Sequence, residues 1–178
     1  MRPVIIGIGG GHSGAGKTSV ATHILQSFRS WGAIKYTRTS LYASIVDDSA
    51  VVSQEGKDTK RLLEAGAGKV IWVQAPYAEL EAVLPVAMDM LADLEGIVIE
   101  GNSPMDFIRP DIVVFVAGSR GKMKSSANRV LHMADIVIYR SQQPPETPGH
   151  AILFKARQLE GLIPCLAGLI TKARRNVE

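Results

Sequence analysis

The stretch that decides the fold is Gly11-His12-Ser13-Gly14-Ala15-Gly16-Lys17-Thr18. Its glycines and its closing Lys-Thr pair match the pattern G-x-x-x-x-G-K-[ST] at every constrained position. Glycines let the backbone turn with its N–H groups pointing inward, and these groups form an anion cradle with the N-terminus of the following helix. An apolar run precedes the stretch at residues 4–8, and an amphipathic segment follows it. The stretch therefore predicts a loop that binds the phosphates of a nucleoside triphosphate.

The side chains of this loop have separate expected roles. Lys17 is expected to bridge β- and γ-phosphate oxygens, and the hydroxyl of Thr18 is expected to bind Mg²⁺. The alternative is a glycine-rich turn without a ligand. The predicted nucleotide-binding residues are Gly11, His12, Ser13, Gly14, Ala15, Gly16, Lys17, Thr18 and Ser19.

Short β-branched runs recur along the whole chain and alternate with longer amphipathic segments. The expected strands span residues 4–8, 33–36, 70–73, 97–99, 112–116, 136–139 and 152–154. The expected helices span residues 17–31, 59–67, 86–94, 125–134 and 159–174, with Pro85 in the first turn of the third and Pro164 interrupting the last. This alternation predicts a three-layer α/β fold of the P-loop NTPase type, with a mostly parallel sheet of about seven strands and helices on both faces.

Length and composition limit the class of protein. The 178 residues suffice for one compact domain and are too few for two ordinary ones, so residues 1–178 are expected to form a single domain. The apolar runs are strand-sized and no secretory signal is recognisable, which predicts a cytoplasmic protein without a membrane role. The net charge of +3 does not favour nucleic acid as a partner. The single cysteine, Cys165, excludes an internal disulfide.

A carboxylate closes one of the buried strands. Glu100 follows the apolar residues 97–99, at the edge where a parallel sheet collects its ligands. Its carboxylate is expected to hold Mg²⁺ through water or to position the attacking water. The alternative is an acidic residue that leaves the strand for solvent. The predicted catalytic residues are Lys17 and Glu100, and the predicted metal ligands are Thr18 and Glu100.

Basic residues near other strand ends are candidates for an anion clamp. Lys35 belongs to the end of the second strand, and Arg120, Lys122 and Lys124 follow the fifth. These cations can hold phosphates of the nucleotide or of a second substrate. The alternative for the last three is a solvated basic loop.

Other polar residues leave their roles open. Asp47 and Asp48 are compatible with a metal contact and equally with an exposed loop. The sixth strand is not followed by the Asn/Thr-Lys-x-Asp pattern whose aspartate reads guanine, so this feature does not separate GTP from ATP. The four histidines have no metal-ligand spacing.

Several segments form a pattern beyond the phosphate loop. They are residues 11–18, Ile34-Lys35, Gly56-Lys57-Asp58-Thr59, Glu64-Ala65-Gly66-Ala67 and Ile97-Val98-Ile99-Glu100-Gly101. Together they resemble the MobB family, the P-loop GTP-binding proteins of molybdopterin-guanine dinucleotide biosynthesis. The resemblance reaches about Met105, and the chain diverges from the family beyond it. It implies binding of GTP with Mg²⁺, slow hydrolysis, a homodimer and a partner protein in cofactor assembly.

The leading hypothesis is therefore a Mg²⁺-dependent NTPase, more typical of GTP than of ATP, that assists assembly of the molybdenum cofactor or a related cofactor. A small-molecule kinase is one alternative, with its acceptor near Asn102, Ser103 and Arg109 and an arginine-bearing lid at residues 120–129. A nucleotide-gated binding module with negligible hydrolysis is another, because the sequence contains no obvious general base.

Overall fold

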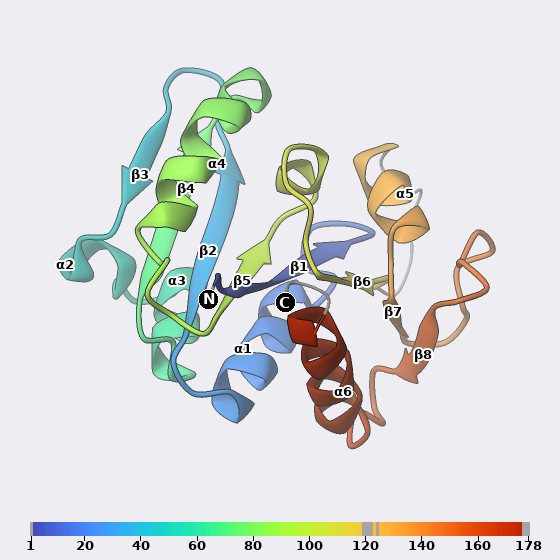
Figure 1. Cartoon of the computed structure of the whole chain (residues 1–178). Coiled ribbons are helices and arrows are strands. Elements are labelled where there is room, and N and C mark those ends of the chain that lie inside the picture. The colour runs from blue at the N-terminus through green and yellow to red at the C-terminus, as the bar shows by residue number, and fades with distance from the viewer. Residues whose placement is uncertain (1, 119–122, 124, 176–178) are drawn as a thin grey trace.

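A computed structural model describes residues 2–118, 123 and 125–175, and an eight-stranded sheet forms its centre (Figure 1). Seven parallel strands pair in the spatial order β4-β2-β5-β1-β6-β7-β8, and β3 pairs antiparallel with β4 at one edge. The strands are β1 (Val4–Gly10), β2 (Trp31–Arg38), β3 (Ser44–Val46), β4 (Val70–Ala75), β5 (Gly96–Glu100), β6 (Ile112–Val116), β7 (Ile136–Tyr139) and β8 (Ile152–Lys155).

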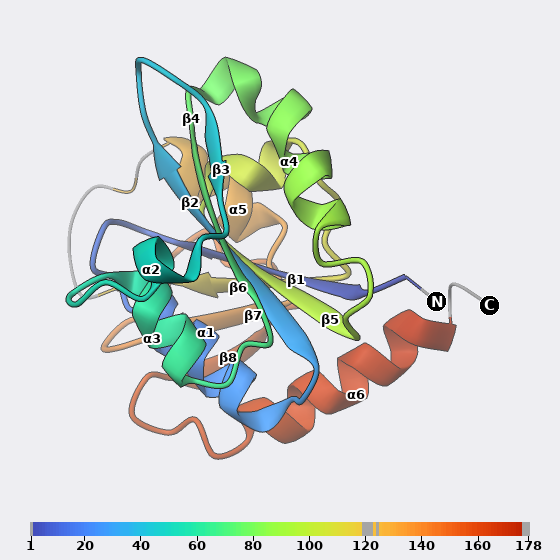
Figure 2. The same ribbon diagram turned by 90° about the vertical axis from the view of Figure 1, so that its left-hand side faces the viewer.

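Helices cover both faces of this sheet. The segments are α1 (Lys17–Ser27), α2 (Ser49–Val52), α3 (Asp58–Glu64), α4 (Leu80–Asp89), α5 (Ser125–His132) and α6 (Leu162–Arg175), with short 3-10 turns η1 (Tyr77–Glu79) and η2 (Ser103–Asp106). Apolar residues of α1, α3 and α6 pack on one face, and those of α4 and α5 pack on the other. Figure 2 shows α3 and α4 on opposite sides of β2 and β4. The predicted three-layer α/β fold is confirmed.

Residues of the central strands alternate between the two apolar layers. In β1, Ile6 and Ile8 pack toward α1, while Ile5 packs toward α4. Burial on both faces explains why these strands are continuous apolar runs in the sequence. Within the sheet, β1 pairs with β5 on one side and with β6 on the other. The carboxyl end of β1 leads directly into the phosphate loop.

The structure corrects several expected boundaries. Helix α1 ends at Ser27, and Trp31 begins β2, although it fits the helical period. Helix α4 begins at Leu80, so Pro85 lies inside it and not in its first turn. Pro164 is the third residue of α6, where a missing backbone N–H breaks no helical hydrogen bond. Strand β3 was not expected, because its three half-buried residues form only a short edge pairing.

No helix of the described residues is long and apolar enough to cross a lipid bilayer.

The first residue of β5 is a glycine for steric reasons. A Cβ added at Gly96 would lie 2.3 Å from Cε2 of Trp31, whose side chain is fully buried. We expect Gly96→Ala to lower the free energy of unfolding by about 2 kcal/mol, because the buried indole must shift. Gly149→Ala is the matched control, since nothing lies within 4 Å of its added Cβ. Chemical denaturation measures both, and equal stabilities of the two variants would contradict the expectation.

Candidate functional site

The loop between β1 and α1 closes on itself as the motif requires. Gly14 and Gly16 have φ values of 75° and 107°, in the left-handed region that favours glycine. The backbone N–H of Ala15 donates to the carbonyl oxygen of His12 at 3.3 Å. The Nζ of Lys17 donates to the same oxygen at 3.1 Å. The motif residues thus form a compact loop that opens α1.

A partly buried charged cluster, with Glu100 at its buried end, lies beside this loop. Lys35 in β2 and Glu100 in β5 are register partners on adjacent parallel strands, so their side chains leave the same face of the sheet. The Lys35 Nζ lies 2.5 Å from Glu100 Oε1 and 2.7 Å from Asp58 Oδ2. The Thr18 Oγ1 lies 3.0 Å from each oxygen of the Glu100 carboxylate and donates to it. We call Thr18, Lys35, Asp58 and Glu100 the Glu100 cluster.

The cluster and the loop line one cavity of about 230 Å³. Arg61 closes its rim, because its Nη2 donates to Ser19 Oγ at 3.2 Å and its Nη1 lies 3.5 Å from Asp58 Oδ1. The lining residues are Ser13, Gly14, Gly16, Lys17, Thr18, Ser19, Lys35, Asp58, Arg61 and Glu100. The structure therefore brings together predicted residues from the loop, from the first turn of α1, from β2 and from β5.

The ion pair between Lys35 and Asp58 favours the charged form of both groups. Burial acts to lower the pKa of Lys35, but the charge of Glu100 and hydrogen bonds to both carboxylates outweigh it, and the pKa is raised. Burial acts to raise the pKa of Asp58, but hydrogen bonding to Lys35 and the positive charge of Lys35 outweigh it, and the pKa is lowered. The ammonium form of Lys35 and the carboxylate form of Asp58 are thus both favoured in the cavity.

These shifts predict how stability changes with pH. Because Asp58 has a lower pKa in the folded chain than its ordinary 3.8, its contribution is fully present above 3.8 and is lost as the pH falls through the lowered pKa of the folded chain. Lys35, whose pKa is raised above 10.5, contributes below that value and loses its contribution as the pH rises through its raised pKa. We expect Asp58→Asn to show a shallower loss of unfolding free energy on acidification than the unsubstituted chain.

Urea unfolding between about pH 6 and pH 2 measures this difference. Asp89→Asn is the control, because Asp89 is exposed and has no ion pair with a described residue. An acid-side slope for Asp58→Asn as steep as that of the control would show that Asp58 does not contribute.

The oxygen donors of the cluster fit Mg²⁺ as one part of a coordination shell. Thr18, Asp58 and Glu100 offer hydroxyl and carboxylate oxygens, which this hard cation prefers. Within the described part of the chain, no group of three or more His, Cys, Asp or Glu residues could hold a metal ion. A Mg²⁺ ion here would therefore take its remaining ligands from phosphate oxygens and water.

Asn102 and His12 complete the surroundings of the loop. The Asn102 side chain accepts from Gly10 N at 2.8 Å and donates to Gly10 O at 2.9 Å, which fixes the end of β1. The His12 Nδ1 lies 2.6 Å from Ser13 O, and its buried Nε2 has no hydrogen-bond partner among the described residues. The His12 ring occupies the space that a Cβ at Gly118 would need. Asn102 therefore fixes the strand end that leads into the loop, and the His12 ring packs against Gly118.

Other candidate residues lie away from the cavity. Asp48 caps α2 by accepting from Ala50 N at 2.8 Å, and Asp47 forms an ion pair with Lys69 at 2.9 Å, so neither lines the phosphate cavity. Of the four residues proposed for the anion clamp, Lys35 belongs to the cavity. Arg120, Lys122 and Lys124 lie outside the described residues.

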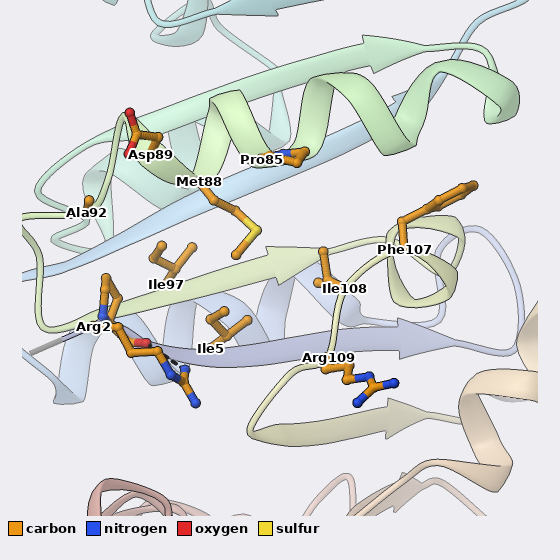
Figure 3. Close-up of a pocket in the computed structure, with 11 residues that line it drawn as sticks. Arg2, Ile5, Pro85, Met88, Asp89, Ala92, Ile97, Phe107, Ile108 and Arg109 are labelled. Carbon is orange, nitrogen blue, oxygen red and sulfur yellow. Dashed lines mark hydrogen bonds between the residues drawn. The ribbon is translucent and has the colours of Figure 1, made fainter. Parts of the chain in front are cut away.

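The residues considered for a kinase acceptor do not share a cavity. Arg109 lines an apolar cavity of about 530 Å³ between α4 and the strands β1 and β5, with Met88 and Ile97 (Figure 3). Ser103 lines another cavity. Arg129, at the end of the proposed lid, donates to Asp106 at 2.6 and 2.9 Å. This arginine thus ties α5 to η2.

Two residues of the cavity were not among the predicted site residues. Asp58 and Arg61 lie in α3, far along the chain from the loop. The segment Gly56-Lys57-Asp58-Thr59 is one of the segments that resemble the MobB family, and this resemblance is the signal that the sequence offers for Asp58. Nothing in the sequence singled out Arg61.

Comparisons with known proteins concern the fold. No protein-family model matches the chain, and no curated protein matches it. Among solved structures, HypB from Helicobacter pylori, determined in complex with nickel, is similar with a TM-score of 0.55 and 15% sequence identity. The match covers 98% of this chain and 89% of that chain. It supports the P-loop NTPase type of α/β fold, and the MobB family is not identified by these comparisons.

Proposed function

We propose that the chain binds GTP with Mg²⁺, hydrolyses it slowly and assists the assembly of the molybdenum cofactor or a related metal-containing cofactor. The observation that carries the nucleotide part is the Glu100 cluster, which lies against the phosphate loop in one cavity. A phosphate loop next to a buried carboxylate and a threonine hydroxyl is the arrangement that nucleotide with Mg²⁺ requires.

Different residues of the cavity bind the phosphates and the Mg²⁺ ion. The loop N–H groups and Lys17 hold the phosphates, and Ser19 lines the cavity beside them. Thr18 and Glu100 bind Mg²⁺ directly or through water, and the ion neutralises phosphate charge when it is bound. Lys35 keeps the Glu100 carboxylate in place, at 2.5 Å from Oε1. This arrangement makes Lys35 a positioning residue.

Slow hydrolysis is supported by the state of the carboxylates. Both carboxylates that line the cavity are engaged: Asp58 by Lys35 and Arg61, and Glu100 by Lys35 and Thr18. A carboxylate held in this way serves the metal and is poorly placed to orient an attacking water. A protein with such a site works better as a switch between triphosphate and diphosphate states than as a rapid enzyme.

The role in cofactor assembly is supported by two likenesses. The segments up to about Met105 resemble the MobB family, which implies a homodimer and a partner protein. The HypB structure, which has a similar fold, was determined with nickel. Both likenesses favour a role in preparing a metal-containing cofactor.

A titration with fluorescent GTP and ATP analogues tests the nucleotide part. We expect tighter binding of the GTP analogue, and loss of affinity for both when a chelator removes Mg²⁺. Absence of binding by either analogue would overturn the proposal. Single-turnover phosphate release then separates a slow NTPase from a binding module, and acceptor-dependent turnover would instead support the kinase alternative.

A further inference from the structure

A second polar cavity lies at the same edge of the sheet as the phosphate loop. It measures about 630 Å³ and lies between the end of β2, the segments that follow β4 and β5, and the first half of α5. Ligands of parallel sheets gather at this edge, beyond the carboxyl ends of the strands. Its lining residues are Arg38, Tyr77, Ser103, Ser125, Ser126 and Arg129, and we call it the Arg38 pocket.

The Arg38 pocket and the phosphate cavity are built on the same two strands. In β2, Lys35 lines the phosphate cavity and Arg38 lines the Arg38 pocket. Glu100 at the end of β5 lines the first, and Ser103, which follows β5, lines the second. The buried Tyr36 lies between Lys35 and Arg38 in the chain, and its hydroxyl donates to a backbone carbonyl at 3.0 Å. Because side chains alternate along a strand, Lys35 and Arg38 leave β2 on opposite faces, so the two cavities lie on opposite faces of the sheet near the same strand ends.

The pocket carries an excess of positive charge. Arg38 is exposed and forms no ion pair with a described residue. Arg129 is fixed by Asp106, to which Tyr77 also donates at 3.1 Å. The charge of Asp106 is thus balanced by Arg129, and the charge of Arg38 remains available to a ligand.

Hydroxyl and amide donors surround this charge. Ser103 contributes one hydroxyl, and Ser125 and Ser126 are the first two residues of α5, where backbone N–H groups lack helical partners. Guanidinium, hydroxyl and N–H groups are all donors, and a phosphate group offers oxygens to each. A cavity of about 630 Å³ is larger than a phosphate group needs, and the half-exposed ring of Tyr77 offers a surface for an organic body.

We propose that the Arg38 pocket binds the phosphate group of a small organic phosphate monoester, beyond the same strand ends as the nucleotide and on the opposite face of the sheet. The position relative to the nucleotide rests on the proposed function, whereas binding in the pocket itself does not. The ligand contacts Arg38 through its phosphate oxygens and Tyr77 through its organic part. This assigns a second ligand to the edge of the sheet that the phosphate loop shares.

Calorimetric titration of the full chain with phenyl phosphate tests the proposal. Saturation with a non-hydrolysable GTP analogue and Mg²⁺ first blocks the phosphate loop, and a parallel titration omits the nucleotide. We expect Arg38→Gln to weaken phenyl phosphate binding about tenfold and Arg38→Lys to weaken it less, because lysine keeps the charge and loses the bidentate geometry. Arg140→Gln is the matched control, an exposed arginine after β7 that should leave binding unchanged.

The arms of this experiment separate the two proposals. Two results would overturn the proposal for the Arg38 pocket. One is that phenyl phosphate does not bind when the phosphate loop is saturated with nucleotide. The other is that it binds the Arg38→Gln variant as tightly as it binds the unsubstituted chain. Inorganic phosphate that binds as tightly as phenyl phosphate would contradict the organic ligand. A chain that binds no nucleotide, yet binds phenyl phosphate in an Arg38-dependent manner, would overturn the proposed function and leave the pocket supported.

Discussion

Substitution of Lys17 by alanine is expected to weaken GTP binding about 100-fold, because a charge-assisted contact to phosphate contributes about 3 kcal/mol. The Nζ of this lysine donates to a carbonyl oxygen of the loop itself, at 3.1 Å, so its charge is held where the motif places the phosphates. The loop conformation rests mainly on its glycines and backbone hydrogen bonds. The folded structure should therefore persist in Lys17→Ala.

Titration with a fluorescent GTP analogue in the presence of Mg²⁺ measures this effect. Lys172→Ala is the matched control, since Lys172 is an exposed lysine near the end of α6 and outside the cavity. Circular dichroism checks that both variants are folded. Unchanged GTP affinity in a folded Lys17→Ala variant would show that the phosphate loop does not bind the nucleotide as proposed.

The fold was largely predictable from local sequence patterns. The phosphate loop placed β1 and α1, and continuous apolar runs placed the other parallel strands, because strands covered on both faces have a recognisable composition. Trp31 was misplaced because it fits the helical period, while packing against Gly96 decides its actual position in β2. Pro85 was misread for a related reason: the buried stripe of α4, with Leu80 and Leu84, extends the helix ahead of the proline.

The site was predictable only where strand ends carried the signal. Thr18, Lys35 and Glu100 each follow from a motif or a strand end, but their contacts depend on the pairing of β2 with β5. Asp58 reaches the cavity because α3 packs beside α1, which is a tertiary contact without a local pattern. The spatial order of the strands is decided by packing over the whole sheet, and single-strand periodicity carries no information about it.

Among the charged side chains, removal of Lys35 is expected to cause the largest loss in the free energy of unfolding. Lys35→Met leaves Glu100, whose exposed fraction is 2%, without its cation, and we expect the free energy of unfolding to fall by about 3 kcal/mol. Glu100→Gln should cost less, because Lys35 keeps its ion pair with Asp58 at 2.7 Å. Urea unfolding in the absence of nucleotide measures both variants.

The double variant Lys35→Met/Glu100→Gln distinguishes electrostatics from packing. If the cost of Lys35→Met arises from the uncompensated carboxylate, removing that charge as well should restore part of the lost stability, and the double variant should be more stable than Lys35→Met alone. If the cost arises from packing of the lysine stem, the two losses should add. Additive losses would mean that the close contact between Lys35 and Glu100 does not stabilise the fold, and that the lysine is retained for the ligand.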